Sequence, residues 1–319
     1  MSAALAVAAC AASASALLVS HALMPKRVRK VHLGGHYMRL SLEHDGRCRT
    51  YGVYQPRSGA TGEGLVVVLH GSRGSGAGIR RWTGNTFDRL ADELGIAIAY
   101  PDGWKGHWND CRKAGAYAAK ALNIDDVGFI DRLVSALAPG GRVAVVGYSN
   151  GGYMGLRWAM QGARTPQGLV MAGASVPVDA NLICTPGRML PPALLVAGTA
   201  DRICPYDGGE VTLLGSPRGA VRSAVDAAGW LAASGSATAA IHAGVDWRSG
   251  RRKDTWTAPG GGRAELLTLE GGGHTLPQPW MRFPRLLGRT DHGIDVAECT
   301  KALLGWEARS DGSRPAANA

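Results

Sequence analysis

The feature that most constrains the fold is a regular alternation of short apolar runs with segments of helical spacing. The apolar runs occupy residues 65–69, 96–100, 143–147, 169–174, 193–197 and 264–269. Helical spacing is found at residues 82–94, 125–137, 153–160 and 294–306. A continuous apolar run is typical of a strand buried on both faces. The alternation therefore predicts an α/β protein with a mostly parallel central sheet and helices on both faces.

Two segments depart from this alternation. Residues 37–54 alternate apolar and polar side chains around His44-Asp45-Gly46, which predicts an antiparallel hairpin. Residues 211–263 are rich in Gly, Ser, Pro and Thr, and helical spacing appears in them only at 221–233. We expect this stretch to form one helix and a loose excursion beside the functional site. No linker or internal repeat is visible, so the sequence predicts one domain over residues 31–306, followed by a polar tail at 307–319.

The N-terminal segment has the composition of an export leader. Residues 2–23 are almost all Ala, Val, Leu and Ser, and small-residue cleavage positions lie near 13–16. Residues 1–30 are accordingly expected to direct the protein to a secreted or periplasmic location. The basic residues follow the apolar stretch instead of preceding it, so a membrane anchor, a true start at Met24 and a simple Ala-rich tail stay open. Membrane contact is expected only if this segment is retained.

The charge balance does not by itself identify a partner, and no nucleic-acid partner is predicted. The formal net charge is +10, and most of the excess is Arg. The arginines are scattered, and no basic–aromatic stripe or nucleic-acid-binding motif accompanies them. We expect a basic surface that favours polyanionic or cell-wall material.

The six cysteines do not indicate a metal site. They occur at positions 10, 48, 111, 184, 204 and 299, without a C-x-x-C pair or metal-ligand spacing. No metal site is therefore predicted, and the serine chemistry described below needs no cofactor. Five cysteines remain if Cys10 is removed with a leader, which allows at most two disulfides; an exported protein could carry these, and a cytosolic one would keep thiols.

The strongest chemical signal is the pentapeptide Gly147-Tyr148-Ser149-Asn150-Gly151. It follows the apolar run at 143–146 and precedes the helical segment at 153–160. This strand–turn–helix setting is the one that a nucleophile elbow needs. The flanking glycines avoid collisions in the sharp turn, and the following helix directs its positive N-terminal end at the serine. Ser149 is therefore the predicted nucleophile.

A serine hydroxyl becomes nucleophilic only when a base accepts its proton. In chains with this type of elbow the order is Ser, acid, His. His274 fits the position of the base because it follows the predicted strand at 264–269 and three glycines. His242 and His292 also come after the serine, but neither follows a strand with a glycine lead.

The acid is expected on the loop after the predicted strand at 193–197. Asp201 lies there, in Gly198-Thr199-Ala200-Asp201. Its carboxylate would orient the imidazole and stabilise the imidazolium. Asp207 is the rival in the same loop, with capping of the 205–209 turn as its alternative role.

Two further features are expected around the predicted triad Ser149, Asp201 and His274. Backbone amides of Ser72, after His70-Gly71, and of Asn150 are predicted to form an oxyanion hole. His70 itself is expected to order its loop. Trp108 and Trp280 are candidates for the walls of the substrate cleft, with loop packing as the alternative for each.

Nine short blocks of the sequence carry a family resemblance. They are Leu69-His70-Gly71, Tyr100-Pro101-Asp102-Gly103, Trp108-Asn109, Asp125-Asp126-Val127-Gly128-Phe129, Gly147-Tyr148-Ser149-Asn150-Gly151-Gly152, Gly198-Thr199-Ala200-Asp201, Pro205-Tyr206-Asp207-Gly208-Gly209, Gly271-Gly272-Gly273-His274-Thr275 and Ile294-Asp295. In this order the chain resembles the polyhydroxybutyrate depolymerase family of esterases, which is related to the feruloyl and acetylxylan esterases of carbohydrate esterase family one. Leu276 departs from the aromatic residue that often follows His-Thr in that family.

The resemblance implies an α/β-hydrolase fold, export, no metal, and hydrolysis of a small, oligomeric or polymeric ester by a serine esterase. A feruloyl or acetylxylan esterase acting on plant cell walls is the first alternative. A peptidase of the same fold would usually carry a propeller or cap domain, for which the chain has no room. A non-catalytic binding protein on a hydrolase scaffold would be favoured if a triad residue were missing, and none is missing. The oligomeric state is left open.

Overall fold

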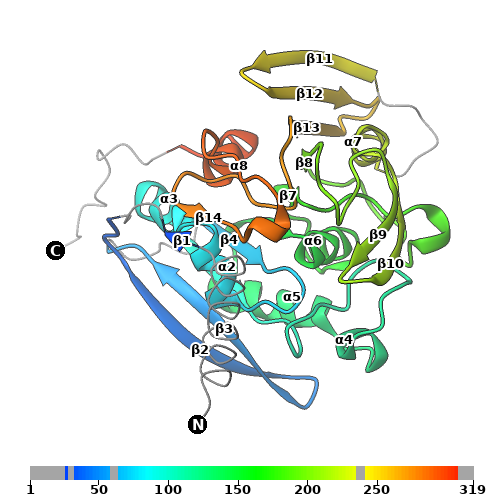
Figure 1. The fold of residues 1–319 in the computed structure, drawn as a ribbon. Coiled ribbons are helices and arrows are strands. Elements are labelled where there is room, and N and C mark those ends of the chain that lie inside the picture. Colours follow the sequence, from blue (N-terminus) through cyan, green and yellow to red (C-terminus); the bar gives the residue numbers. More distant parts are fainter. Residues whose placement is uncertain (1–25, 28–31, 58–63, 235–240, 308–319) are drawn as a thin grey trace, which may run out of the picture.

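A ten-stranded sheet organises the part of the chain that the computed structural model describes, which is residues 26–27, 32–57, 64–234 and 241–307 (Figure 1). Its inner six strands are parallel. Across the sheet they are β13 (Arg263–Leu269), β8 (Ala193–Gly198), β7 (Gly168–Ala172), β6 (Arg142–Tyr148), β4 (Gly64–Leu69) and β5 (Ala97–Pro101). The predicted mostly parallel sheet is confirmed.

Antiparallel pairs complete both edges of the sheet. At one edge β2 (His36–His44) and β3 (Arg47–Gln55) form the predicted hairpin, and β3 pairs with β5. Asp45 and Gly46 make its two-residue turn with φ values of 51° and 66°. Two consecutive left-handed residues match the twist of a tight hairpin. At the other edge β11 (Ile241–Arg248) pairs with β12 (Arg251–Thr257), which pairs with β13.

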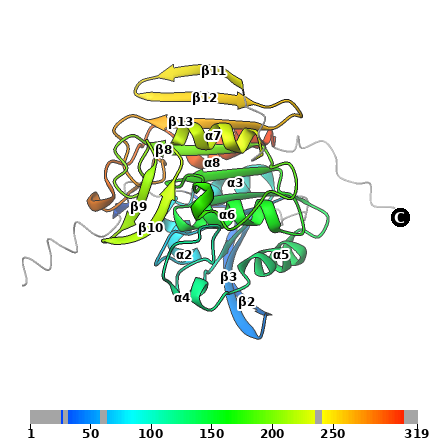
Figure 2. The same ribbon diagram turned by 90° about the vertical axis from the view of Figure 1, so that its right-hand side faces the viewer.

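Alternate side chains of the inner strands enter two separate hydrophobic cores. On β4, Leu65, Val67 and Leu69 face one core, and Val66 and Val68 face the other. The first core is covered by α5 (Asp126–Leu137), α6 (Asn150–Gln161) and α7 (Ala224–Ala232). The second is covered by α2 (Gly76–Trp82), α3 (Thr86–Leu94) and α8 (Val296–Leu304), behind the sheet in Figure 2. Strands buried on both faces explain the continuous apolar runs.

The helical segment expected at 82–94 is interrupted. The chain forms α2 and α3 as separate helices, with Gly84 and Asn85 between them at φ values of 68° and 63°. Left-handed residues end a right-handed helix because they redirect its backbone hydrogen bonds. The break leaves Trp82 at the C-terminal end of α2.

The expectation of a loose excursion at 211–263 is wrong. The segment contains a hairpin of β9 (Gly209–Leu213) and β10 (Ser216–Val221), then α7, and then strands β11 and β12 of the central sheet. Strand β12 reads Arg-Arg-Lys-Asp-Thr-Trp-Thr, and only Asp254 and Trp256 of it are buried. Because strands near a sheet edge keep polar, exposed side chains, they lack the apolar run that identifies inner strands.

The expected leader at 1–30 lies outside the described residues except for β1 (Lys26–Arg27), which pairs with β14 (Met281–Arg282). Most of the polar tail at 307–319 also lies outside them.

The remaining short elements are α4 (Ala118–Ala121), η1 (Asp179–Asn181) and η2 (Arg285–Leu287). None of the described helices is long and apolar enough to cross a membrane.

All cysteines in the described ranges are free thiols: Cys48, Cys111, Cys184, Cys204 and Cys299. The disulfides that the sequence allowed for an exported protein are therefore not formed among them.

Candidate active site

Ser149 lies at the sharp turn between β6 and α6. Its φ of 53° and ψ of −119° are unusual for a residue with a side chain. The turn requires glycine on both sides: a Cβ on Gly147 would lie 2.2 Å from the carbonyl oxygen of Gly151, and one on Gly151 would lie 2.4 Å from that of Leu69. The pentapeptide thus forms the predicted elbow, with Ser149 half-buried at the carboxyl end of β6.

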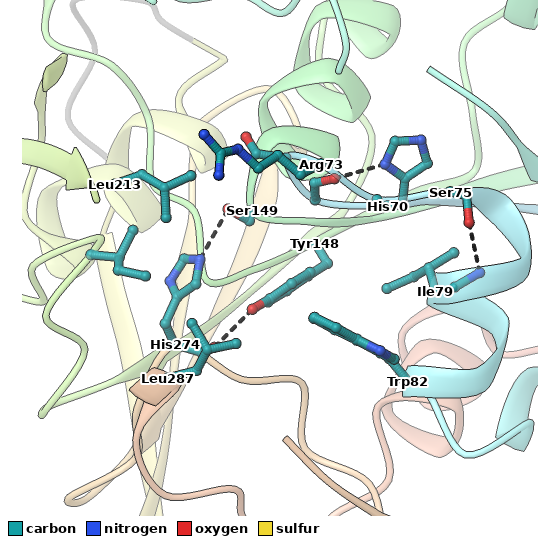
Figure 3. Close-up of a pocket in the computed structure, with 15 residues that line it drawn as sticks. His70, Arg73, Ser75, Ile79, Trp82, Tyr148, Ser149, Leu213, His274 and Leu287 are labelled. Atoms are coloured by element: carbon teal, nitrogen blue, oxygen red, sulfur yellow. Dashed lines mark hydrogen bonds between the residues drawn. The ribbon is translucent and has the colours of Figure 1, made fainter. Parts of the chain in front are cut away.

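His274 and Asp201 meet the serine hydroxyl in one line of hydrogen bonds. His274 Nε2 lies 2.9 Å from Ser149 Oγ, and His274 Nδ1 lies 2.7 Å from Asp201 Oδ2 (Figure 3 shows the first contact). A carboxylate at Nδ1 holds the hydrogen on that nitrogen, so Nε2 can accept from the serine. The structure brings together the three residues that the sequence nominated for the triad.

The loops that carry the acid and the base are bonded to each other. The Ala200 amide donates to the carbonyl oxygen of Gly272 at 2.9 Å, and the Gly271 amide donates to Thr199 Oγ1 at 2.8 Å. Asp201 Oδ1 also accepts from the amides of Ile203 and Cys204. These bonds fix the carboxylate toward the imidazole.

The rival acid lies elsewhere. Asp207 is exposed, and no hydrogen bond or ion pair joins its side chain to another described residue. Asp201, in contrast, is only 8% exposed. Of the two carboxylates, Asp201 is the one in contact with His274.

The two predicted oxyanion donors flank the serine. Asn150 is the first residue of α6, where a backbone N–H has no acceptor within the helix. Ser72 lines the same cavity as Ser149. A Cβ built on Gly71 would lie 3.2 Å from Ser149 Cβ, so the backbone of the 70–74 loop passes close to the nucleophile. Both backbone segments therefore lie close to the nucleophile, and their amides stay the predicted oxyanion donors.

His70 fixes this loop as a neutral imidazole. Its Nε2 accepts from the Gly103 amide at 2.9 Å, so Nδ1 carries the hydrogen and donates to the carbonyl oxygen of Gly71 at 2.7 Å. Burial lowers the pKa of His70 to about 4. The residue therefore orders the loop, as the sequence suggested.

A buried polar cluster holds the side chain of Asn150. Asn150 Oδ1 accepts from the Trp108 amide at 2.8 Å, and Nδ2 donates to Asp110 Oδ2. Burial alone would raise the pKa of Asp110, but the charges of Arg112 and Lys120 outweigh it and lower that pKa. The first turn of α6 is thereby tied to the 108–112 loop.

A cavity of about 440 Å³ opens at Ser149 and His274. Its apolar wall consists of Ile79, Trp82, Leu213 and Leu287, which Figure 3 shows, together with Ile203. The wall therefore draws on α2, the acid loop, β9 and η2. Such a wall suits an apolar acyl or alcohol group.

Neither tryptophan proposed from the sequence lines this cavity. Trp108 is fully buried beneath the His70 loop, with its indole Nε1 donating to the carbonyl oxygen of His70 at 2.9 Å. Trp280 packs against Gly84 at the junction of α2 and α3. Trp82 is the aromatic wall instead. No motif around Trp82 in the sequence indicates this role. Arg73 also lines the cavity, and its position directly after Ser72 is a signal from which the sequence could have predicted it.

In the described ranges, no group of three or more His, Cys, Asp or Glu side chains is arranged so that it could hold a metal ion.

Comparison with known proteins supports the fold. No family model and no curated protein sequence matches the chain. Among solved structures, an acetyl xylan esterase from Aspergillus awamori is similar, with a TM-score of 0.52, 14% identity, and coverage of 89% of this chain and 99% of that one. An α/β serine hydrolase from Xanthomonas campestris has a TM-score of 0.39, 21% identity, and coverage of 55% and 76%. The fold is that of the α/β-hydrolases.

Proposed function

We propose that the protein is a serine esterase that hydrolyses carboxylic esters through an acyl-enzyme. The observation that carries the proposal is the pair of contacts at His274, 2.9 Å to Ser149 Oγ and 2.7 Å to Asp201 Oδ2. His274 accepts the serine proton while Ser149 attacks the ester carbonyl. The amides of Ser72 and Asn150 stabilise the oxyanion, and His274 then protonates the departing alcohol. Water hydrolyses the acyl-enzyme by the same route.

The finer substrate class rests on the sequence blocks and on the cavity. The resemblance to polyhydroxybutyrate depolymerases favours esters of hydroxy acids, and the apolar wall of Ile79, Trp82 and Leu213 suits their short alkyl groups. A feruloyl or acetylxylan esterase is the alternative, and the similar fold of an acetyl xylan esterase is compatible with it. Residues 2–23 support export to a secreted or periplasmic location, which N-terminal sequencing of the secreted protein would test.

The purified protein should hydrolyse 4-nitrophenyl esters of short acids, and a fluorophosphonate should label Ser149. Hydroxybutyrate oligomers and methyl ferulate, assayed side by side, distinguish the two substrate classes. Hydrolysis of amides without hydrolysis of esters would indicate a peptidase. A folded protein that neither reacts with the fluorophosphonate nor cleaves any ester would contradict the proposal and favour a binding protein.

The triad variants should lose activity to different extents, with Asp201→Asn losing less than Ser149→Ala or His274→Ala. Ser149→Ala and His274→Ala should lower kcat by several orders of magnitude, and Asp201→Asn by about 10³ to 10⁴, because the amide stabilises the wrong tautomer of His274. Asp207→Asn is the matched control, since this exposed carboxylate does not contact His274. A larger loss for Asp207→Asn than for Asp201→Asn, measured with 4-nitrophenyl acetate, would contradict the assignment.

A further inference from the structure

Arg73 is a cation without a protein partner at the edge of the active-site cavity. It lines the cavity with Ser149 and is exposed. No hydrogen bond or ion pair joins its guanidinium to another residue in the described part of the chain, where 13 other Arg and Lys side chains do form ion pairs. In Figure 3 its side chain extends from the His70 loop toward the Leu213 side of the cavity.

A second unpaired arginine lies behind Arg73. A Cβ on Gly106 would lie 3.3 Å from Arg73 Cα, so the 105–107 loop packs against it. In that loop His107 stacks on the ring of Tyr117, with centroids 4.9 Å apart. The guanidinium of Arg218, on β10, lies 5.1 Å from the centroid of the same ring. Arg218 thus lies near enough to Arg73 for the two positive charges to interact.

Arg218 is buried, and part of its guanidinium lacks a hydrogen-bond acceptor. The residue is 8% exposed, and its Nε and Nη1 are buried with no hydrogen-bond acceptor in the described chain. A buried guanidinium without an acceptor is costly. The acids around it are engaged elsewhere: Asp110 binds Arg112 and Lys120, and Glu210 Oε1 accepts the backbone amides of Arg218 and Gly219.

The cluster therefore carries an excess of positive charge. Burial lowers the pKa of Arg218, and the nearby charges of Arg112 and Arg73 add to that effect. Burial, together with Arg218 and Arg73, also lowers the pKa of His107.

We propose that Arg73, supported by Arg218, binds a carboxylate on the substrate, so that the preferred esters are anionic. This inference rests on the esterase function proposed above. A guanidinium matches a carboxylate with two parallel N–H donors, and it does so best where no protein acid competes. The apolar wall of the cavity holds the alkyl part of the same ester, while its carboxylate lies at the Arg73 rim.

Two pairs of isosteric esters test the proposal. 4-Acetoxybenzoate and 4-acetoxybenzamide differ in charge on the alcohol side, and mono-4-nitrophenyl glutarate and the 4-nitrophenyl ester of glutaric acid monoamide differ in charge on the acyl side. The measured quantity is the ratio of kcat/KM for the anionic ester to that for the neutral ester. In at least one pair we expect Arg73→Gln to lower this ratio about tenfold or more, the size of a lost charge-assisted hydrogen bond. Arg73→Lys should retain part of the ratio.

The control is Arg81→Gln, which removes an exposed arginine of α2 that does not line the cavity and should leave both ratios unchanged. Arg218→Gln should lower the same ratio as Arg73→Gln, by a smaller factor. Unchanged ratios for Arg73→Gln in both pairs would overturn the proposal and leave the esterase function standing.

A binding measurement distinguishes failure of the carboxylate site from failure of the proposed esterase function. Ser149→Ala protein should bind 4-hydroxybenzoate or glutarate more tightly than the corresponding amides in calorimetry, and Arg73→Gln should abolish the difference. Such binding in a protein that cleaves no ester would retain the carboxylate site and reject the esterase function. Equal affinity for acids and amides would count against the carboxylate site.

Discussion

At the scale of single residues, the site combines a strained serine with rigid support. The left-handed φ of 53° at Ser149 is unfavourable for a residue with a Cβ, by about 1–2 kcal/mol. The surrounding bonds hold it there: the Ser149 amide donates to the carbonyl oxygen of Ala172, and its carbonyl oxygen accepts from the Gly152 amide, both at 2.8 Å. Tyr148 donates its hydroxyl to the carbonyl oxygen of His274 at 2.8 Å. The neighbour of the nucleophile therefore also positions the base.

The neutral state of His70 predicts a loss of stability in acid. Its pKa is about 4 in the folded protein, against about 6.5 in an unfolded chain. Between pH 4 and pH 6.5 the unfolded state binds more protons than the folded state, so the free energy of unfolding falls as pH falls. Full stabilisation is present above pH 6.5, and about 2 kcal/mol of it should be lost between pH 7 and pH 5.

Urea unfolding of the protein and of His70→Gln at both pH values measures this contribution. Glutamine cannot titrate, so the difference between pH 7 and pH 5 should be smaller in the variant by about 2 kcal/mol. An equal pH dependence in the two proteins would contradict a buried, neutral His70.

At the scale of elements, the break between α2 and α3 is what brings Trp82 to the cavity. Gly84 lies at this break with a φ of 68°, and a Cβ there would lie 2.8 Å from Trp280 Cβ and 2.9 Å from Gln278 Oε1. Gln278 cannot easily move, because it is fully buried and its Oε1 accepts from the amides of Trp280 and Met281. Gly84→Ala should therefore destabilise the protein by about 3 kcal/mol, through both backbone strain and steric overlap.

Gly95→Ala is the matched control for that variant. Gly95 ends α3 with a φ of 67°, but a Cβ there would meet nothing within 4 Å. Only the backbone strain remains, about 1 kcal/mol. Equal losses in the free energy of unfolding for the two variants would show that the packing of Gly84 against the 278–281 loop contributes nothing.

The elements also explain which features could be predicted from the sequence. Inner strands such as β4 and β6 are buried on both faces, and that burial demands the apolar runs from which they were predicted. Strand β12, in contrast, carries mainly polar side chains, so the sequence of the 211–263 segment does not predict a strand there. The triad positions follow from the order of strands and loops. The cavity wall does not, because Trp82, Leu213 and Leu287 come from separate elements whose packing no local motif encodes.

At the scale of the whole molecule, two large cores on opposite faces of the sheet stabilise the described chain without covalent cross-links. The thiols within this framework have little tendency to react. Burial raises the pKa of Cys204 to about 12 and that of Cys299 to about 11, and it raises the pKa of Cys111 and Cys184 as well. A thiol kept protonated and shielded is a poor nucleophile. Cys48 alone among the described cysteines is exposed.

This difference predicts the thiol chemistry of the folded protein. In a Cys10→Ser background, one thiol should react rapidly with 5,5′-dithiobis(2-nitrobenzoate) under native conditions, and Cys48→Ser should remove that rapid phase. All five should react in guanidinium chloride without prior reduction, because each is a free thiol in the structure. A reductant should leave the melting temperature unchanged. Fewer than five reactive thiols before reduction, or a melting temperature that falls with reductant, would mean that a disulfide stabilises the fold, as expected for many exported proteins.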